Sequence, residues 1–196
     1  EPITPSNISV TPHTSHGSAA RPRPTRVGSS IIFTDRPGKR VREVSYSYQE
    51  DGLVSRDTTH ISEHILRDGG GVIETAYQQE PNNILWFLLT DGTLAAMTWN
   101  KEQEVAAWHR HIIAGGGADA VVESIACVPS ADSSRDDLYL IVKRTINGAT
   151  QRWVEMMEED FYPTSASTKT GMRFLDGGRL IENFTGTVIT GLTHLE

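Results

Sequence analysis

The run ILWFLL within residues 84–90 constrains the fold of this chain more than any other stretch. Successive side chains of a β-strand point to opposite faces of the sheet. One face of this strand therefore carries three apolar side chains centred on Trp86, and the other face carries three centred on Phe87. A strand that is apolar on both faces must be covered on both faces. The run therefore predicts a sheet packed between two other layers, whereas a two-sheet sandwich would usually leave one face polar.

Three glycine turns recur at a regular interval. Gly38, Gly92 and Gly148 are 54 (92 − 38) and 56 (148 − 92) residues apart, and each follows a β-like run. Asp91-Gly92 suits a type I′ hairpin turn, in which both central residues have a positive φ. A period of about 55 residues with about four strands per unit is similar to that of propeller blades. Three units cannot close a propeller ring, so we expect an open arc or further blades upstream.

Other segments are also typical of an all-β protein. Further β-like runs cover residues 71–78, 93–99, 105–112, 118–128 and 137–157. One short helix is predicted over 58–67, with Asp57 as its N-cap and with Ile61, Ile65 and Leu66 at helical spacing. The predicted fold is thus a set of antiparallel meander repeats, propeller-like, with one helix. We expect a buried core that includes Trp86, Phe87, Leu89, Met97, Ile125, Leu140 and Val142.

Composition divides the chain into three parts. Residues 1–27 are rich in Pro, Ser, Thr and Arg and predict an extended N-terminal arm, because they cannot bury much apolar surface alone. Residues 28–161 hold the three repeats of the propeller-like domain. Residues 162–196 begin as a polar linker and continue into the start of a following β domain, which we expect to be cut short. The absence of an initiator Met predicts a fragment of a longer protein.

Charge and composition argue against several function classes. The net charge of −7 argues against a general nucleic-acid coat, and the local basic stretch 21–43 is best interpreted as a solvated sheet edge. No apolar run approaches the roughly 20 residues that span a membrane, and no signal peptide is recognisable. The single cysteine, Cys127, fits a reducing compartment, and its apolar neighbours predict a buried side chain rather than a nucleophile.

Candidate chemistry is sparse. His60 and His64 have helical spacing and His109 and His111 alternate onto one strand face, yet no acidic or Cys partner stands at a recognisable metal-ligand spacing. A glycosidase needs two carboxylates across a cleft, and the sequence brings no such pair together. There is no phosphate loop and no nucleophile elbow. We therefore expect no catalytic, cofactor-binding or metal-binding residues, and no enzymatic activity.

Several stretches resemble a family of phage and prophage virion proteins, which are similar to the tail nozzle, or tail tubular, proteins of short-tailed phages. The strongest are EQEVAAWHRH and ITGLTHLE, and the resemblance covers about residues 5–196. It implies a structural tail protein that assembles with copies of itself and with neighbouring tail proteins into a ring. DNA would be passing cargo. The implied location is the virion, after assembly in a bacterial cytoplasm, with no membrane partner and no cofactor.

A ring subunit must present polar rims to its neighbours. The candidate interface residues lie at expected strand ends and loops, and they are Lys101, Glu102, Glu104, His109, Arg110, His111, Arg135 and Asp137. The alternative function is a carbohydrate-binding or glycan-cleaving propeller used at the host surface. A cleft lined by paired carboxylates and exposed Trp, or binding on a glycan array, would distinguish this alternative.

Overall fold

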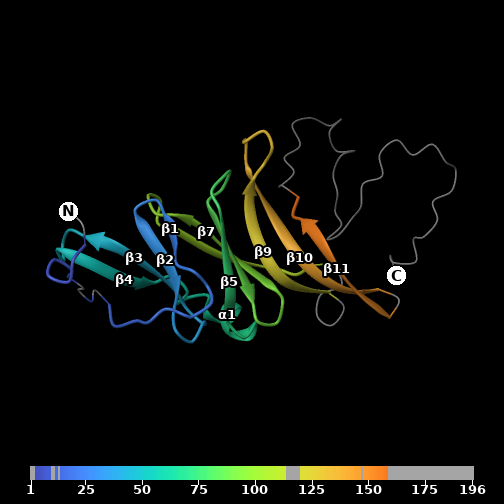
Figure 1. The fold of residues 1–196 in the computed structure, drawn as a ribbon, viewed down its shortest axis with the longest axis horizontal. Coiled ribbons are helices and arrows are strands. Elements are labelled where there is room, and N and C mark those ends of the chain that lie inside the picture. Colours follow the sequence, from blue (N-terminus) through green and yellow to red (C-terminus); the bar gives the residue numbers. More distant parts are fainter. Residues whose placement is uncertain (1–2, 10–11, 13, 114–119, 147, 159–196) are drawn as a thin grey trace.

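The structure is a computed structural model that describes residues 3–9, 12, 14–113, 120–146 and 148–158. Within them the chain forms three antiparallel sheets and one short helix, which confirms the predicted all-β class (Figure 1). Sheet 1 contains β1 (Thr25–Val27), β2 (Ser30–Thr34), β3 (Val41–Ser47) and β4 (Gly52–Asp57). Sheet 2 contains β5 (Val72–Gln78), β6 (Ile84–Leu89), β7 (Leu94–Asn100) and β8 (Val105–His111). Sheet 3 contains β9 (Ala120–Pro129), β10 (Asp136–Ile146) and β11 (Ala149–Met156). Helix α1 (Glu63–Asp68) connects sheet 1 to sheet 2. Every sheet is a meander, so neighbours in sequence are neighbours in space.

Sheet 2 lies between the other two sheets, as the doubly apolar run at 84–89 predicts (Figure 1). On one face Phe87 belongs to a core that includes Val41 of sheet 1. On the opposite face Trp86 belongs to a second core that includes Leu140 of sheet 3. All seven residues predicted to be core are buried, namely Trp86, Phe87, Leu89, Met97, Ile125, Leu140 and Val142.

The three turn glycines fall in three different sheets. Gly38 lies between β2 and β3, Gly92 between β6 and β7, and Gly148 between β10 and β11. In each sheet the glycine turn therefore joins the second strand to the third. This arrangement is the one expected if each turn belongs to its own unit, because the three turns do not share one continuous sheet.

The predicted type I′ turn at Asp91-Gly92 is wrong. Of the two residues only Gly92 has a positive φ, 81°. Its N–H donates to the carbonyl of Leu89 (2.9 Å), and the Leu89 N–H donates to the carbonyl of Thr93 (3.0 Å). Such a three-residue loop, with glycine in the left-handed region, is the second common hairpin connection. The Asp91 carboxylate accepts hydrogen bonds from the Thr93 N–H and hydroxyl, which stabilises this turn instead of a type I′ turn.

The registers of the three sheets correspond. A row of paired residues crosses the first three strands of each sheet, and the rows are Thr25–Ile32–Glu43, Ala76–Trp86–Ala96 and Ala126–Tyr139–Met156. Two positions nearer the turn stand the pairs Thr34–Val41, Leu88–Leu94 and Ile141–Val154. Side chains in equivalent rows therefore point in equivalent directions relative to their own sheet.

The predicted helix over 58–67 begins later than expected. Helix α1 starts at Glu63, and its N-cap residue is Ser62 rather than Asp57. Asp57 ends β4, and its carboxylate instead accepts hydrogen bonds from the N–H and hydroxyl of Thr59, as in an Asx turn. Ile61 precedes the helix and is 94% exposed, whereas Ile65 and Leu66 are buried as predicted.

Two strands lie where the sequence predicted none. Strand β1 is formed by the last three residues of the predicted arm, and Ser18 forms an isolated bridge with Asp35. Strand β4 covers residues 52–57, a short and largely polar stretch. Both strands lie at the edges of sheet 1, where only one neighbouring strand is needed. The predicted linker and following domain, residues 162–196, lie outside the described residues.

Candidate functional site

The sheets are joined by backbone hydrogen bonds at the glycine turns. The Val72 N–H donates to the carbonyl of Gly38 (2.8 Å), which joins sheet 2 to sheet 1. The Val122 N–H donates to the carbonyl of Gly92 (3.0 Å), which joins sheet 3 to sheet 2. In both cases a buried glycine turn contacts the beginning of the first strand of the next sheet. We call these contacts the first and the second junction.

Each junction is followed by the same irregularity of the strand. In β5 the pairing with β6 shifts between Val72 and Glu74 and skips Ile73. In β9 the pairing with β10 skips Glu123, the residue after Val122. A bulge bends a strand and increases its twist, so each first strand changes direction directly after its junction. Both residues that start a junction, Val72 and Val122, are buried.

Glu74 adds a side-chain contact to the second junction. Its carboxylate accepts hydrogen bonds from the Ile125 N–H (3.1 Å) and from the Ser124 hydroxyl (3.2 Å). The acceptor lies on β5 of sheet 2 and the donors on β9 of sheet 3. Hydrogen bonds to a charged acceptor are stronger than those between neutral groups, so Glu74 fixes the position of β9 after its bulge.

An ion pair between a buried carboxylate and an exposed lysine connects sheet 2 to sheet 1. Glu43 lies inside sheet 1, where its carboxylate accepts a hydrogen bond from Ser30 (2.6 Å) and lies 2.7 Å from the Lys101 ammonium. Lys101 comes from the turn between β7 and β8. Burial alone would raise the pKa of Glu43, but the hydrogen bonds from Lys101 and Ser30 outweigh it, and the pKa is lower than its ordinary value. Lys101, a predicted interface residue, therefore contacts its own chain.

The predicted interface residues lie at two opposite ends of the strands. One group lies in the β7–β8 turn and near the β9–β10 turn, and it contains Lys101, Glu102, Glu104, Arg135 and Asp137. The other group lies at the end of β8 beside the Gly92 turn, and it contains His109, Arg110 and His111. Arg135, in the β9–β10 turn, pairs at 2.7 Å with Asp137 near the start of β10. Arg110 donates to the carbonyl of His64 (3.0 Å) in α1.

The histidine pairs have different surroundings. His60 precedes α1, so it does not share a helix with His64. His109 Nδ1 and His111 Nε2 lie 2.6 Å apart, and the His111 ring lies 4.8 Å from that of Trp86. Within the described part of the chain, no three His, Cys, Asp or Glu side chains are placed to hold a metal ion. No helix of the described residues has the length and apolar character needed to cross a bilayer.

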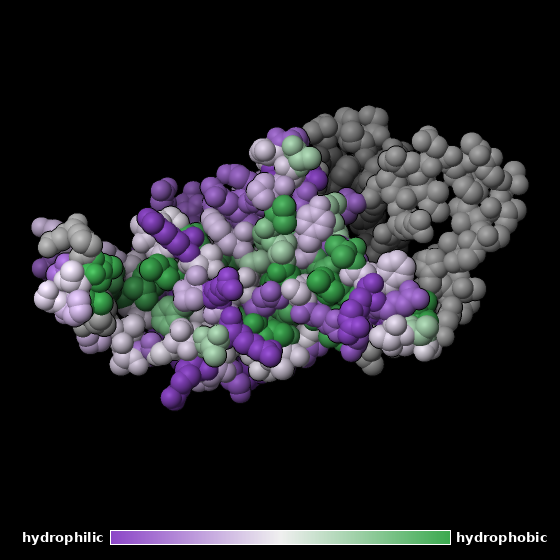
Figure 2. All heavy atoms as spheres, viewed as in Figure 1, coloured by the Kyte–Doolittle hydropathy of each residue, from purple (hydrophilic) through white to green (hydrophobic). Residues whose placement is uncertain are grey.

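The two end sheets expose apolar side chains. On sheet 1, Ile31, Tyr46 and Leu53 point away from sheet 2 and are exposed. On sheet 3 the side of the sheet that faces away from sheet 2 carries Ala126, Tyr139, Ile141, Val154 and Met156. We call these five residues the outer face of sheet 3; the four larger ones are 37% to 75% exposed. Figure 2 shows hydrophobic areas between hydrophilic ones on the visible side of the molecule.

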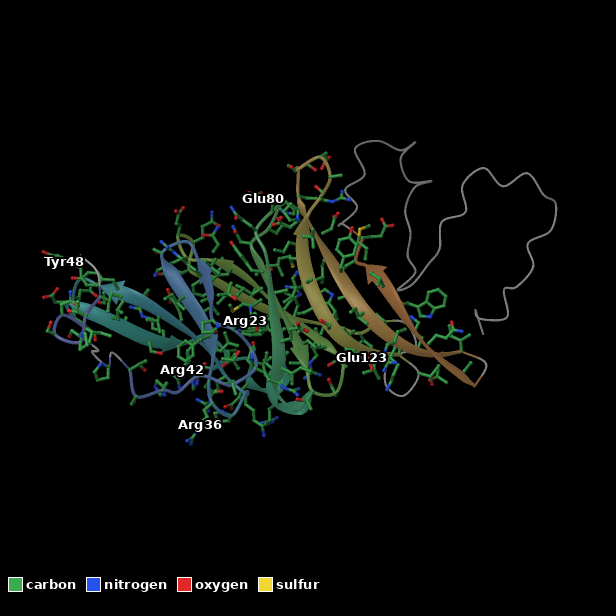
Figure 3. All side chains as sticks on the ribbon, in the orientation of Figure 1. Arg23, Arg36, Arg42, Tyr48, Glu80 and Glu123 are labelled. Carbon is green, nitrogen blue, oxygen red and sulfur yellow. The ribbon has the colours of Figure 1, made fainter. Side chains whose placement is uncertain are left out.

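A charged hollow of about 570 Å³ lies beside β5 and β9. Arg23 and Glu123, both labelled in Figure 3, line it together with Glu74. Glu123 forms a two-bond ion pair with Arg152, and Glu74 is bound to β9 as described above. Both carboxylates thus have partners within the chain, and none of the described lining residues is a tryptophan. The hollow does not match the cleft that would favour a glycan-cleaving protein.

Cys127 lies on β9 and packs against the core between sheets 2 and 3. Burial, together with the negative charge of Asp136, raises the pKa of its thiol to about 12. A thiol with so high a pKa is a poor nucleophile at neutral pH. Cys127 is half-buried, so the prediction of a buried side chain holds only in part.

Sequence reasoning did not find the junctions. Their donors and acceptors are backbone groups, and a backbone hydrogen bond leaves no residue type to recognise. The signal that was available is the recurrence of the turn glycines, since Gly38 and Gly92 are the two acceptors. No protein-family model matches the chain, and no curated protein matches it in sequence.

Proposed function

We propose that the three sheets are copies of one unit of about 55 residues, packed as neighbouring propeller blades, and that the chain is a structural component of a phage or prophage tail. Support for the repeat comes from the matching registers, the two equivalent junctions and the bulge that follows each of them. The tail assignment rests on the resemblance of EQEVAAWHRH and ITGLTHLE to virion proteins. In this function the chain acts through subunit contacts rather than through chemistry.

The observation that carries the proposal is the apolar surface at both ends of the stack. Monomeric soluble proteins rarely expose large contiguous apolar patches, and such patches commonly mark interaction sites. Tyr46 and Leu53 on sheet 1 and Tyr139 and Ile141 on sheet 3 are all exposed. An element of a larger assembly, in which further sheets or subunits cover both faces, accounts for this distribution.

Polar rims complete the proposed interface. Glu102 and Glu104 are exposed in the β7–β8 turn, and Arg110 is exposed at the other end of β8. Non-obligate interfaces combine a buried apolar centre with a polar rim of this kind. Homo-oligomers are usually closed and symmetric, so we expect a ring with a defined number of subunits. DNA would pass through such a ring as cargo.

Multi-angle light scattering of the purified protein tests this proposal. We expect a particle whose mass is a fixed multiple of the subunit mass over a wide range of concentrations. Leu53→Lys, on the outer side of sheet 1, should shift the mass towards the monomer, because it places a charge on the apolar surface. Tyr48→Lys is the matched control, since Tyr48 is 91% exposed in the turn after β3 and should leave the mass unchanged.

A monomer at every concentration, together with cleavage or binding on a glycan array, would replace this proposal by the carbohydrate alternative. An unchanged mass for both variants would show that sheet 1 takes no part in the contacts. Either result would be independent of the fold, which circular dichroism of each variant monitors.

A further inference from the structure

The middle sheet shows how neighbouring sheets of this fold meet. Sheet 2 uses a different face for each neighbour, because successive side chains of its strands point to opposite sides. The face toward sheet 1 carries Leu85, Phe87, Met97 and Trp99. The face toward sheet 3 carries Ala76, Trp86, Leu88, Leu94 and Ala96. All of these residues are buried, so sheet 2 has one contact face for the sheet before it and another for the sheet after it.

The outer face of sheet 3 corresponds to the face of sheet 2 that packs against the next sheet. In the matching registers its five residues take the positions of Ala76, Trp86, Leu88, Leu94 and Ala96. The residues of sheet 2 are buried, whereas the four larger residues of the outer face of sheet 3 are exposed. Sheet 3 therefore presents the kind of face with which this fold meets a following sheet.

The side of sheet 1 that points away from sheet 2 corresponds to the other kind of face. Its residues Ile31, Val44 and Tyr46 take the positions of Leu85, Met97 and Trp99 in the register of sheet 2. Leu53 is paired with Tyr46 and completes this surface. We call Ile31, Val44, Tyr46 and Leu53 the outer face of sheet 1; Val44 is half-buried and the other three are exposed. Phe33, at the position of Phe87, is already buried.

The two outer faces are therefore the two halves of one contact that the chain already makes twice within itself. Sheet 1 meets sheet 2, and sheet 2 meets sheet 3, each time by joining the following-sheet face of one to the preceding-sheet face of the other. Sheets 1 and 3 lie at the two ends of the stack, so one half of the contact remains exposed at each end (Figure 1). None of the nine residues of the two faces is charged, so no like charges oppose their contact. A second copy of the chain thus offers sheet 3 the kind of partner that sheet 2 has.

We infer that the outer face of sheet 3 packs against the outer face of sheet 1 in a second copy of the chain, so that subunits join head to tail. Such a contact is heterologous, because the two copies use different surfaces, and heterologous contacts build a closed ring when the rotation between subunits closes. The inference rests on the assembly proposed above and adds which surfaces of the two copies meet. It is independent of the tail assignment.

Two charge variants of the complete chain test the contact by light scattering over a dilution series. Ile141→Lys places an ammonium group on the outer face of sheet 3, and Leu53→Lys places one on the outer face of sheet 1. Each should weaken association by at least ~30-fold, as the loss of a central interface residue does, because every head-to-tail contact needs both surfaces. Ile61→Lys is the matched control: Ile61 is 94% exposed before α1, and this variant should keep the mass of the unmodified protein.

A mixture of the two variants distinguishes a head-to-tail contact from a contact between identical faces. The Leu53→Lys chain retains its outer face of sheet 3, and the Ile141→Lys chain retains its outer face of sheet 1. At concentrations at which each variant alone is monomeric, the mixture should form particles of two subunits and no larger ones, because one intact pair of faces remains. The double variant, with both substitutions in one chain, is the control and should stay monomeric when it is mixed with either single variant.

Two results would overturn the inference and leave the proposed assembly intact. One is an unmodified protein that assembles while the mixture stays monomeric. The other is a single variant that keeps its full mass, since its substituted face would then be covered in another way or take no part. An unmodified protein that is monomeric at every concentration would instead overturn the proposed assembly, and the inference with it. Circular dichroism of each variant separates loss of mass from loss of fold, and Val154→Lys, at a position that is 75% exposed, replaces Ile141→Lys if that variant does not fold.

Discussion

Replacing Trp86 by alanine should lower the free energy of unfolding by about 3–5 kcal/mol, the range for a buried aromatic residue. Trp86 is 3% exposed, and its neighbours across the sheet on the same face are Ala76 on β5 and Ala96 on β7. Three alanines in one row could not close the space that the indole fills. The loss should therefore fall in the upper part of the range, because its size grows with the cavity that remains.

The indole also has a polar contact. Its N–H donates to the side-chain carbonyl of Gln78 (2.9 Å), so the substitution leaves this acceptor without its donor. One such bond contributes about 1 kcal/mol. The effect is smaller than that of the cavity, because Gln78 is only half-buried and water can replace the donor.

A urea titration followed by far-UV circular dichroism measures the change without relying on tryptophan fluorescence. The midpoint should fall while the m-value stays constant, as for a pure loss of stability. Trp153→Ala is the control: Trp153 is 48% exposed on β11, and its loss should cost less than about 1 kcal/mol. A change below about 1 kcal/mol for Trp86→Ala would refute the packing of sheet 2 against sheet 3.

Three further changes test the junctions and the core. Lys101→Met should lower the free energy of unfolding at neutral pH, because it leaves the Glu43 carboxylate buried without its cation. Since the pKa of Glu43 is lowered in the folded state, the difference in this free energy from the unmodified protein, measured by urea titration, should shrink as the pH falls below 4.5. Gly92→Ala should cost more stability than Gly148→Ala. Both glycines have a positive φ, which strains alanine by about 1–2 kcal/mol, but among the described residues the new Cβ meets a neighbouring sheet at Gly92 and not at Gly148. Cys127 should not react with a thiol reagent at pH 8 until denaturant is added, because the pKa of its thiol is about 12; rapid reaction of the folded protein would show that the thiol is exposed.

Much of the fold could be predicted because the pattern of side chains records burial. The run at 84–89 is apolar on both faces, and this alone indicated that sheet 2 is the middle layer. Strand β4 was missed because an edge strand needs little apolar surface, and residues 52–57 contain a glycine, a serine, an arginine and an aspartate. The helix start was misplaced because the same aspartate that can cap a helix can also close an Asx turn, and Asp57 does the latter.

The candidate site was less predictable. Lys101 stays a predicted interface residue with a side chain that is 42% exposed, but the sequence did not indicate that its ammonium also binds Glu43, a residue 58 positions earlier (101 − 43). The sequence does not predict that a surface lysine and a buried glutamate so far apart in the chain will form an ion pair. His109 and Arg135 were both predicted at polar rims, and the sequence did not show that they lie at opposite ends of the strands, because β8 runs away from the β7–β8 turn. The direction of a strand in the sheet is set by the complete meander rather than by its own residues.

Mass spectrometry of purified virions tests the proposed tail function most directly. Trypsin should release the peptide EQEVAAWHR, residues 102–110, from particles that retain their tails after gradient purification. We expect this peptide at a fixed ratio to the major capsid protein, as for a ring of constant subunit number. Its absence from intact virions, with the protein recovered instead from the surrounding medium, would contradict the proposed function.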